Sequence, residues 1–233
     1  MKAYVLAGGE GTRLKPYTYM VPKPMLLLAG KPILEYVLDN LKRSGITEVI
    51  LTVSYQHEQI QQYFGDGKKF GMKITYSVEK ERMNTAGSIL ERKIDETFAV
   101  VMGDHLTNIN LKDMVKNHKE SGAIATIALY KDSTPLEYGV AQVTDGQITG
   151  FQEKPLLEHL YNTAIYIFEP EIYDYIKGKE DFAKHVIPRL ISEKKKVNAY
   201  VFDDVWFDIG RVADYERLAD LFKVIKIVND LKI

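Results

Sequence analysis

Residues 2–14 read KAYVLAGGEGTRL: an apolar run of strand-forming residues leads directly into three glycines within four positions. The run predicts a buried strand over residues 2–7, and the glycines predict a tight loop at its carboxyl end. Glycine lets backbone N–H groups approach an anion closely, where a side chain would clash. Because ligands of open α/β sheets bind at this edge, the stretch predicts both a fold class and an anion site.

Outward from this stretch, strand-like runs alternate with helical patterns through the first half of the chain. Further strands are predicted at 48–53, 73–78 and 98–102. Between them, apolar residues at three- and four-residue spacing predict one helix from residue 33 to 44 and another that includes 60–64. This alternation predicts an α/β fold whose parallel sheet is built with right-handed crossovers.

The middle of the chain has a different pattern. Four strand-like runs, Ala123–Tyr130, Tyr138–Val143, Ile148–Glu153 and Tyr161–Phe168, follow one another with turn residues between them. Helical patterns return over 182–193 and from residue 213 onward. With no repeat or low-complexity linker, the expected organisation is one domain over residues 1–233, a mixed sheet with an inserted antiparallel lobe.

Composition is that of an ordinary soluble globular protein. The chain has 233 residues, 45% of them hydrophobic, and 31 Lys plus Arg against 32 Asp plus Glu, so its formal net charge is −1. Near-neutral charge gives no case for nucleic-acid or anionic-membrane binding. The absence of cysteine excludes disulfides, thiolate zinc sites and a cysteine nucleophile. Without a signal peptide or an apolar run long enough to span a bilayer, a cytoplasmic protein is expected.

Positive charge is concentrated around the glycine-rich loop. Residues 1–31 contain five cations, Lys2, Arg13, Lys15, Lys23 and Lys31, against the single acid Glu10. This excess beside a glycine loop favours a polyphosphate ligand. The P-loop pattern, the dinucleotide pattern G-x-G-x-x-G and the kinase triplet H-R-D are all absent, which excludes those three phosphate-binding families.

Residues 6–18 (LAGGEGTRLKPYT) and 22–25 (PKPM) resemble the signature of the sugar-1-phosphate nucleotidylyltransferase family. The resemblance extends along the chain through TAGS at 85–88, GD at 103–104, YGV at 138–140, EKP at 153–155, NTAIY at 162–166 and WFDIG at 206–210. It implies a Rossmann-like fold, with a mixed, mainly parallel sheet flanked by helices and a small antiparallel sugar-binding lobe. The implied reaction joins a nucleoside triphosphate to a sugar 1-phosphate and releases pyrophosphate, with Mg²⁺ as cofactor. Larger relatives carry a carboxyl-terminal β-helix of hexapeptide repeats, which this sequence does not show.

Arg13 and Lys23 are the expected catalytic residues. The planar guanidinium of Arg13 can hold two phosphate oxygens and stays charged, whereas Lys23 offers a point charge on a segment stiffened by two prolines. The family resemblance assigns nucleotide binding to the glycine-rich loop and to a second segment where a helix N-terminus is expected. These residues are Leu6, Ala7, Gly8, Gly9, Gly11, Thr12, Arg13, Asn84, Thr85, Ala86 and Gly87.

Two aspartates are the expected metal ligands. Asp104 follows a buried strand and Asp208 lies among apolar residues, and the resemblance makes them the carboxylates that hold Mg²⁺, an ion that prefers hard oxygen ligands. The neighbouring His105 is interpreted as a satisfied or solvated histidine. Sugar-phosphate binding is assigned through the resemblance to Gly139, Glu153, Lys154 and Asn162.

The substrate pair is less sharply defined by sequence. The Thr-Ala-Gly form at 85–87 favours a mannose-1-phosphate guanylyltransferase, and a glucose-1-phosphate thymidylyl- or uridylyltransferase is the alternative. A non-catalytic regulatory homologue and a nucleotide-sugar glycosyltransferase remain rivals. A homo-oligomer contact is predicted on the last helix. One apolar stripe (Leu218, Leu221, Phe222, Ile225, Val228) is expected to pack on its own domain, and a second (Val224, Ile227, Leu231) to be left for a larger core or a partner.

Overall fold

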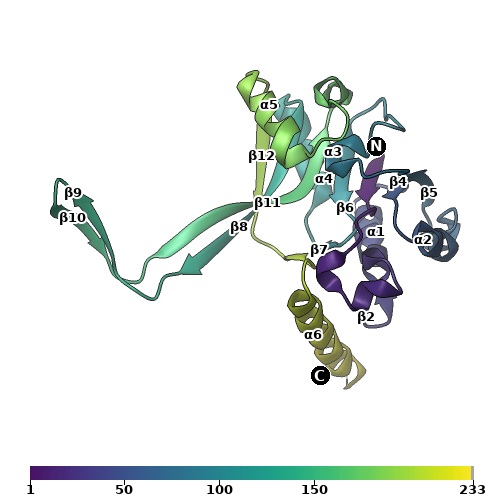
Figure 1. The fold of residues 1–233 in the computed structure, drawn as a ribbon, viewed down its shortest axis with the longest axis horizontal. Coiled ribbons are helices and arrows are strands. Elements are labelled where there is room, and N and C mark those ends of the chain that lie inside the picture. The colour runs from purple at the N-terminus through teal and green to yellow at the C-terminus, as the bar shows by residue number, and fades with distance from the viewer. Residues whose placement is uncertain (232–233) are drawn as a thin grey trace.

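A seven-stranded sheet forms the centre of the computed structural model, which describes residues 1–231 and the side chains of residues 1–225 (Figure 1). The strand order is β12-β8-β11-β6-β1-β4-β5. The strands are β1 (Ala3–Leu6), β4 (Glu48–Val53), β5 (Lys73–Val78), β6 (Phe98–Met102), β8 (Ala125–Pro135), β11 (Leu156–Phe168) and β12 (Val197–Phe202). Only β11 runs antiparallel to its neighbours, so the sheet is mixed and mainly parallel, as predicted.

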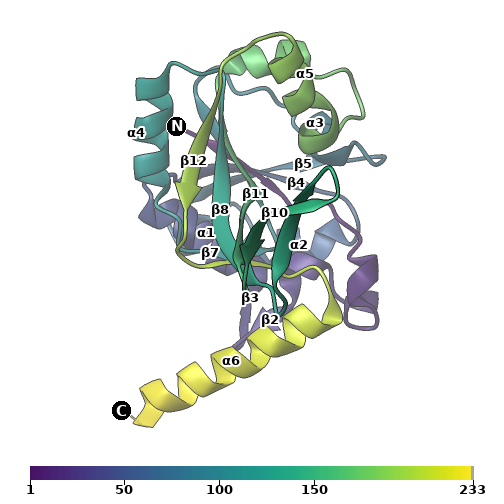
Figure 2. The same ribbon diagram turned by 90° about the vertical axis from the view of Figure 1, so that its left-hand side faces the viewer.

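Helices cover both faces of the sheet. They are α1 (Ile33–Arg43), α2 (His57–Phe64), α3 (Asn84–Gly87), α4 (Leu111–Ser121) and α5 (Ile187–Ser192), and a further helix, α6 (Val212–Leu231), lies away from the sheet. Strand β1 shows how the layers form, since Ala3 and Val5 pack toward α1, α2 and α4, while Tyr4 and Leu6 pack toward α3 and α5. Figure 2 shows α1 and α4 on one side of the sheet and α3 and α5 on the other. Within the part of the chain that the structure describes, no helix combines the length and apolar character that crossing a membrane requires.

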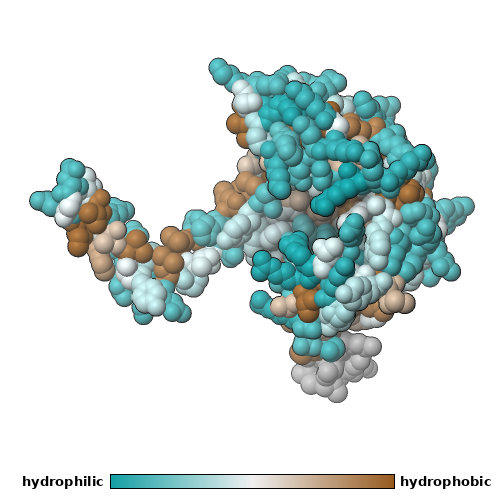
Figure 3. Space-filling view, viewed as in Figure 1, coloured by the Kyte–Doolittle hydropathy of each residue, from teal (hydrophilic) through white to brown (hydrophobic). Residues whose placement is uncertain are grey.

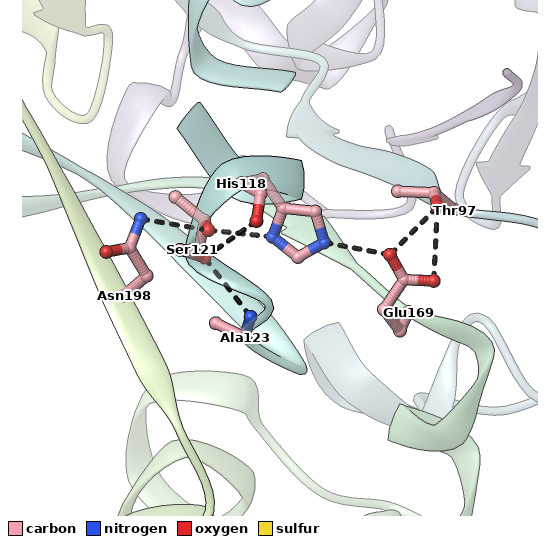
Figure 4. A network of polar contacts seen from close by, with 7 residues as sticks. Thr97, His118, Ser121, Ala123, Glu169 and Asn198 are labelled. Atoms are coloured by element: carbon pink, nitrogen blue, oxygen red, sulfur yellow. Dashed lines mark hydrogen bonds and ion pairs between the residues drawn. The ribbon is translucent and has the colours of Figure 1, made fainter. Parts of the chain in front are cut away.

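A buried histidine ties α4 to the sheet (Figure 4). His118 Nδ1 lies 2.7 Å from the Thr126 hydroxyl on β8, and its Nε2 lies 3.1 Å from Glu169 Oε1, just after β11. Thr97, which precedes β6, donates its hydroxyl proton to the same carboxylate at 2.9 Å. Burial lowers the pKa of His118, and the Glu169 carboxylate opposes this shift only in part. The network therefore joins α4 and three strands through a neutral imidazole.

Replacing His118 with alanine should destabilise the protein by about 3 kcal/mol, because a cavity forms and buried polar partners lose their hydrogen bonds. Urea unfolding of the variant measures this loss. Lys116→Ala is the matched control, because this exposed lysine lies on the same helix and should change the free energy of unfolding by less than about 0.5 kcal/mol. Equal stability of the two variants would mean that the network contributes nothing.

Helix α6 packs against the amino-terminal loop. The Tyr215 ring contacts the Tyr17 ring edge-on at 5.0 Å, and its hydroxyl donates to the Leu27 carbonyl at 2.9 Å. Phe222 packs edge-on against Tyr36 at 5.4 Å. These contacts hold the segment that follows the glycine-rich loop. Two short sheets lie nearby: β2 (Leu27–Leu28) with β3 (Lys31–Pro32), and β7 (His105–Thr107) with β13 (Trp206–Asp208).

The prediction for α6 is correct only in part. Leu218 is buried and Phe222 packs on the domain, but Leu221 and Ile225 of the same stripe are exposed. The reason is visible in Figure 2, where α6 leaves the body of the molecule after its first turns. Val224 of the second stripe is exposed. The side chains of Ile227, Val228 and Leu231 lie outside the described residues.

The predicted antiparallel lobe is present as a projecting arm. Strands β8 and β11 extend beyond their predicted ends and remain paired from Leu156↔Pro135 onward, with β9 (Val140–Thr144) and β10 (Gln147–Gln152) as a hairpin at the tip. Figure 1 shows this arm reaching away from the body. We define the arm as residues 131–160.

Candidate active site

The glycine-rich loop leaves the sheet at the carboxyl edge of the parallel strands. Ala7 N donates to the Thr52 carbonyl at the end of β4 (2.8 Å), and Gly103 N donates to the Leu6 carbonyl (2.9 Å). Leu6, the last residue of β1, and Ala7, which follows it, are both buried, and their backbone hydrogen bonds fix where the loop starts. The loop lies at the carboxyl end of β1, as the sequence predicts, and the structure places it between the ends of β4 and β6.

Gly11 is the turning point of the loop. Its φ of +64° is a left-handed conformation that favours glycine, and a side chain there would lie 2.9 Å from Thr18 Cγ2 and 3.1 Å from Lys23 Cβ. The Thr18 hydroxyl donates to the Gly11 carbonyl at 2.9 Å. Gly11 thus lets the chain fold back over Lys23. The next turn, Thr12–Leu14, buries Leu14 and leaves Arg13 exposed above the edge.

Lys23 is not a solvated surface cation. It is only 7% exposed, lies between Pro22 and Pro24, and forms an ion pair with Asp104 Oδ2. Burying an ion pair is unfavourable unless the remaining polar atoms are also satisfied. Asp104 Oδ1, however, is buried without a hydrogen-bond partner among the described residues. The ion pair therefore leaves one carboxylate oxygen, Asp104 Oδ1, without a hydrogen-bond donor at the end of β6.

Asp208 reaches the same place from the other end of the chain. The pairing of β7 with β13 sets Asp208 opposite His105, whose Nε2 lies 3.4 Å from Asp208 Oδ1 and 3.7 Å from Asp104 Oδ1. His105 Nδ1 lies 3.0 Å from the Thr163 carbonyl, which can only accept, so Nδ1 donates. The imidazole is thereby held between the two aspartates. Sequence analysis interprets His105 as a satisfied or solvated histidine and gives it no role at the site. Its position next to Asp104 was the one sequence feature that could have indicated such a role.

Charges in the cluster act on one another. Burial alone would lower the pKa of His105, but the Asp208 contact and the charge of Asp104 raise it overall. The hydrogen bond from His105 lowers the pKa of Asp208, with further lowering from the charges of Lys23 and Arg13. The structure thus brings together the predicted catalytic residues Arg13 and Lys23 and the predicted metal ligands Asp104 and Asp208. It also adds His105 to this group.

The two aspartates fit a divalent cation. Ligand atoms of Asp104, His105 and Asp208 all lie within 4.8 Å of one another. Carboxylate oxygens are the ligands that Mg²⁺ prefers, and that ion commonly keeps several water or phosphate partners besides one or two carboxylates. The unpartnered Asp104 Oδ1 is an oxygen that such an ion would satisfy. The residues present therefore fit Mg²⁺.

The second predicted nucleotide segment meets the loop through Glu79. A side chain at Gly8 would lie 3.6 Å from Glu79 Oε2, and Met83 N donates to the same oxygen at 3.5 Å. Glu79 follows β5 and is half-buried, and burial raises its pKa. Sequence analysis did not identify this carboxylate. Asn84, the first predicted residue of the segment, has a φ of +59°, a conformation that asparagine tolerates better than most residues.

Two backbone donors at the expected helix N-terminus are already engaged within the protein. Helix α3 has four residues, and the backbone N–H groups of Ala86 and Gly87 already donate to the Glu180 carbonyl at 2.9 and 3.2 Å. Thr85 donates its hydroxyl proton to Asp181 at 3.0 Å. These three hydrogen bonds hold the segment against the turn that contains Glu180.

The Glu180 side chain is itself fixed by Arg189. The carboxylate accepts two hydrogen bonds from the guanidinium, at 2.6 and 2.9 Å, and this contact lowers the pKa of Glu180 to about 2. A carboxylate with a depressed pKa stabilises the folded state above its unfolded pKa, and the contribution disappears as pH falls toward the folded pKa.

Wild type should therefore melt above Glu180→Gln at neutral pH, and the gap should narrow as pH falls from about 4.5 toward about 2. Thermal melts across this range measure the gap. Glu171→Gln is the control, because Glu171 forms an exposed ion pair with Lys195 and should shift the melting temperature little at any pH. A difference in melting temperature between wild type and Glu180→Gln that stays constant down to pH 2 would contradict the lowered pKa of Glu180.

Of the four predicted sugar-binding residues, only Asn162 lies near this edge, next to Thr163, whose carbonyl contacts His105. Asn162 lies at a register shift of β11 on the body, where its Oδ1 accepts from Ala164 N at 2.9 Å. Gly139, Glu153 and Lys154 lie on the arm, and a side chain at Gly139 would collide with Glu153 Oε2 at 2.7 Å. The structure thus brings Gly139 and Glu153 together, but does not bring them to the glycine-rich loop of the same chain (Figure 1).

Comparison with known proteins identifies the class. The family model described as "Nucleotidyl transferase" matches residues 2–223, and the chain belongs to this family. Among its relatives is a UTP–glucose-1-phosphate uridylyltransferase of Synechocystis, 40% identical over 240 residues that cover 92% of this chain and 61% of that protein. A mannose-1-phosphate guanyltransferase beta-A of Xenopus laevis is 35% identical over 225 residues, covering 92% and 62%. The chain thus spans about three fifths of the length of these relatives.

Solved structures show the same fold. HddC from Yersinia pseudotuberculosis superposes with a TM-score of 0.75 at 25% identity, covering 95% of this chain and 99% of that chain. A Bacillus anthracis structure in complex with a sucrose superposes with a TM-score of 0.76 at 23% identity, covering 95% of each chain. The predicted α/β fold is therefore confirmed.

Proposed function

We propose that the protein transfers a nucleotidyl group from a nucleoside triphosphate to a hexose 1-phosphate. The observation that carries this proposal is the convergence of Arg13, Lys23, Asp104 and Asp208 at the carboxyl edge of the sheet, beside the glycine-rich loop. A phosphate oxygen of the sugar attacks the α-phosphorus, the bond to the β-phosphate oxygen breaks, and pyrophosphate leaves with the electron pair.

The main barrier to this reaction is electrostatic. The attacking phosphate has a second pKa near ~6, so it is mostly ionised at neutral pH and needs no general base. Two anions must approach each other while negative charge shifts to the leaving oxygens, which calls for fixed cations and exact positioning. Exposed Arg13 is suited to binding the triphosphate in a two-point contact, and buried Lys23 to supplying a charge close to the reacting phosphate.

Asp104 and Asp208 would hold Mg²⁺, which when bound neutralises phosphate charge and orients the phosphates. The open Asp104 Oδ1 supports this role. His105 acts as a positioning residue for both carboxylates, since its ring lies between them and is anchored to the Thr163 carbonyl.

For the substrates, we propose UTP and glucose 1-phosphate. The sequence motif at 85–87 favours a guanylyltransferase, but a relative with 40% identity is named a uridylyltransferase, whereas the guanyltransferase of Xenopus laevis is 35% identical. The comparison therefore supports the alternative more than the first expectation. The presence of both cations and both aspartates argues against a regulatory homologue that has lost catalysis.

The test is pyrophosphate release across UTP, dTTP and GTP, each paired with glucose 1-phosphate and mannose 1-phosphate. We expect the highest kcat/KM with UTP and glucose 1-phosphate and no release without added Mg²⁺. Preference for GTP and mannose 1-phosphate would overturn the substrate assignment and keep the reaction class. Release with none of the pairs would overturn the reaction class and favour the regulatory homologue.

A further inference from the structure

Strand β11 contains an irregularity beside the candidate active site. Its pairing with β8 shifts between Asn162 and Tyr166, so that residues 163–165 face the single residue Ala128. We call residues 163–165 the β11 bulge. The pairing of β11 with β6 stops at Tyr166↔Val100, which places the bulge beside the last residues of β6. Bulges are over-represented next to active sites, where they re-aim groups that a regular strand would direct elsewhere.

The β11 bulge has an unusual backbone conformation that specific contacts hold in place. Ala164 has a φ of +55°, in the left-handed region that residues with a side chain rarely adopt. Fully buried Thr163 donates its hydroxyl proton to the Ala128 carbonyl at 2.8 Å. Asn162 Oδ1 accepts from Ala164 N at 2.9 Å, and Asn162 Nδ2 donates to the Tyr166 hydroxyl at 3.1 Å. Such strained conformations persist only where the surroundings determine them, and they cluster at functional sites.

The bulge changes the direction of one carbonyl group. In a regular strand, a carbonyl points toward a neighbouring strand and joins the ladder. The Thr163 carbonyl instead accepts from His105 Nδ1 at 3.0 Å. Nε2 of the same ring lies 3.4 Å from Asp208 Oδ1 and 3.7 Å from Asp104 Oδ1. The bulge is therefore connected to both aspartates through one imidazole.

Packing alone leaves the His105 ring incompletely supported. The ring contacts Trp206 edge-on, with 5.7 Å between the ring centres. It also borders a small internal cavity, whose other lining residues include Asn40, Thr107 and Ile165. Side chains that border a cavity lack packing contacts on that side. The hydrogen bond to the Thr163 carbonyl therefore has to fix the orientation of the ring.

Contacts between the arm and the body do not account for the bulge. Beyond the bulge, the arm stands clear of the body, as Figure 3 shows, and regular pairing with β8 resumes at Asn162↔Leu129. Among the described residues, the side chain outside β8 and β11 with which the bulge forms a hydrogen bond is His105. The contact that distinguishes the bulge thus lies on the side of the active site.

We propose that the β11 bulge is a positioning element of the active site, and that Thr163 and Asn162 are positioning residues that act through His105. The Thr163 hydroxyl and the Asn162 amide fix the bulge, and the bulge directs the Thr163 carbonyl to Nδ1. The anchored imidazole then keeps Asp104 and Asp208 in place. This inference rests on the proposed function, because it takes the roles of the two aspartates from there.

NMR of the substrate-free protein labelled with ¹⁵N-histidine tests the anchoring directly. A donated Nδ1–H exchanges slowly with solvent, so wild type should show an Nδ1–H signal of His105, which is assigned by its loss in His105→Gln. Thr163→Val keeps the shape of the side chain but removes the hydroxyl, and it should speed exchange of this proton about tenfold or abolish the signal. A wild type without the signal, or a signal unchanged in Thr163→Val, would overturn the proposal.

Thr126→Val is the matched control for a lost buried hydroxyl. Thr126 is also fully buried, and its hydroxyl lies 2.7 Å from Nδ1 of a different histidine, His118. Each valine variant should therefore alter the ring signals of its own histidine only. Loss of the His105 signal in both variants would mean that general destabilisation, and not the bulge, controls the ring.

Steady-state pyrophosphate release measures what the anchoring contributes. Thr163→Val should lower kcat about tenfold and raise the Mg²⁺ concentration for half-maximal rate, with KM for both substrates within about twofold of wild type. Asn162→Ala should likewise lower kcat at an unchanged KM for the sugar phosphate, whereas a raised KM at unchanged kcat would overturn its positioning role. Thr126→Val should keep both constants. Wild-type kinetics in Thr163→Val, beside an altered His105 signal, would overturn the link to the active site.

Two substitutions at Ala164 test the bulge conformation without touching a hydrogen-bonding side chain. Glycine adopts positive φ without strain, so Ala164→Gly should keep the His105 signal and kcat. Valine is strongly disfavoured there, so Ala164→Val should lose both. This pair decides the question if Thr163→Val does not fold, and equal results for the two variants would overturn the proposal. Failure of the proposed function is recognised separately, as a wild type that releases no pyrophosphate while the His105 signals still report the anchoring.

Discussion

Asp104→Asn should lower turnover about a thousandfold while the protein remains folded. Asp104 has two functions at the site, since Oδ2 pairs with Lys23 and Oδ1 is the open acceptor for Mg²⁺. The amide removes the negative charge from both. Because Lys23 would also lose its counter-charge, we expect the Mg²⁺ concentration that gives half-maximal rate to rise as well. Asp208→Asn should produce a loss of the same kind.

Steady-state kinetics with a Mg²⁺ titration measure both effects, and circular dichroism checks the fold. Asp66→Asn is the matched control, because Asp66 also pairs with a lysine but at the exposed surface, and its rate should stay within about twofold of wild type. Near-normal turnover in Asp104→Asn and Asp208→Asn would remove the metal assignment.

Arg13→Ala should lower kcat/KM by about a thousandfold. Its guanidinium lies close enough to Asp208 to lower the pKa of that carboxyl group, and it is exposed at the edge where phosphate must bind. Arg13→Lys should recover only part of the loss, because lysine keeps the charge but cannot make a two-point contact.

Lys15→Ala controls for the general loss of positive charge. Lys15 belongs to the same loop but lies over the Tyr19 ring, 5.3 Å from its centre, and its removal should change kcat/KM by only a few fold. If Lys15→Ala and Arg13→Ala were equally impaired, the loop would attract phosphate by charge alone, without the specific contact proposed for Arg13.

The strands could be predicted well because local patterns determine them. Predicted strands at 48–53, 73–78 and 98–102 coincide with β4, β5 and β6, since buried parallel strands are continuous apolar runs. The glycine-rich loop was likewise placed correctly at the end of β1. Asn84 and Ala164 both have positive φ, a backbone conformation that ordinarily favours glycine.

Features that depend on contacts between distant parts of the chain could not be predicted. Nothing local to residues 131–135 or 156–160 indicates that β8 and β11 continue as a paired arm. His105 gains its place between two aspartates only because β13 returns to pair with β7, about a hundred residues later in the chain. Glu79 lies near Gly8 because the sheet order places β5, which precedes Glu79, beside β4 and so close to β1.

The most direct test of the central claim is a crystal structure with UTP and Mg²⁺ bound. The claim is that phosphates bind between the glycine-rich loop and the paired aspartates. We predict triphosphate density against Arg13 and Lys23, with the metal ion beside Asp104 and Asp208. Triphosphate density at any other place on the chain, with this edge left empty, would contradict the claim.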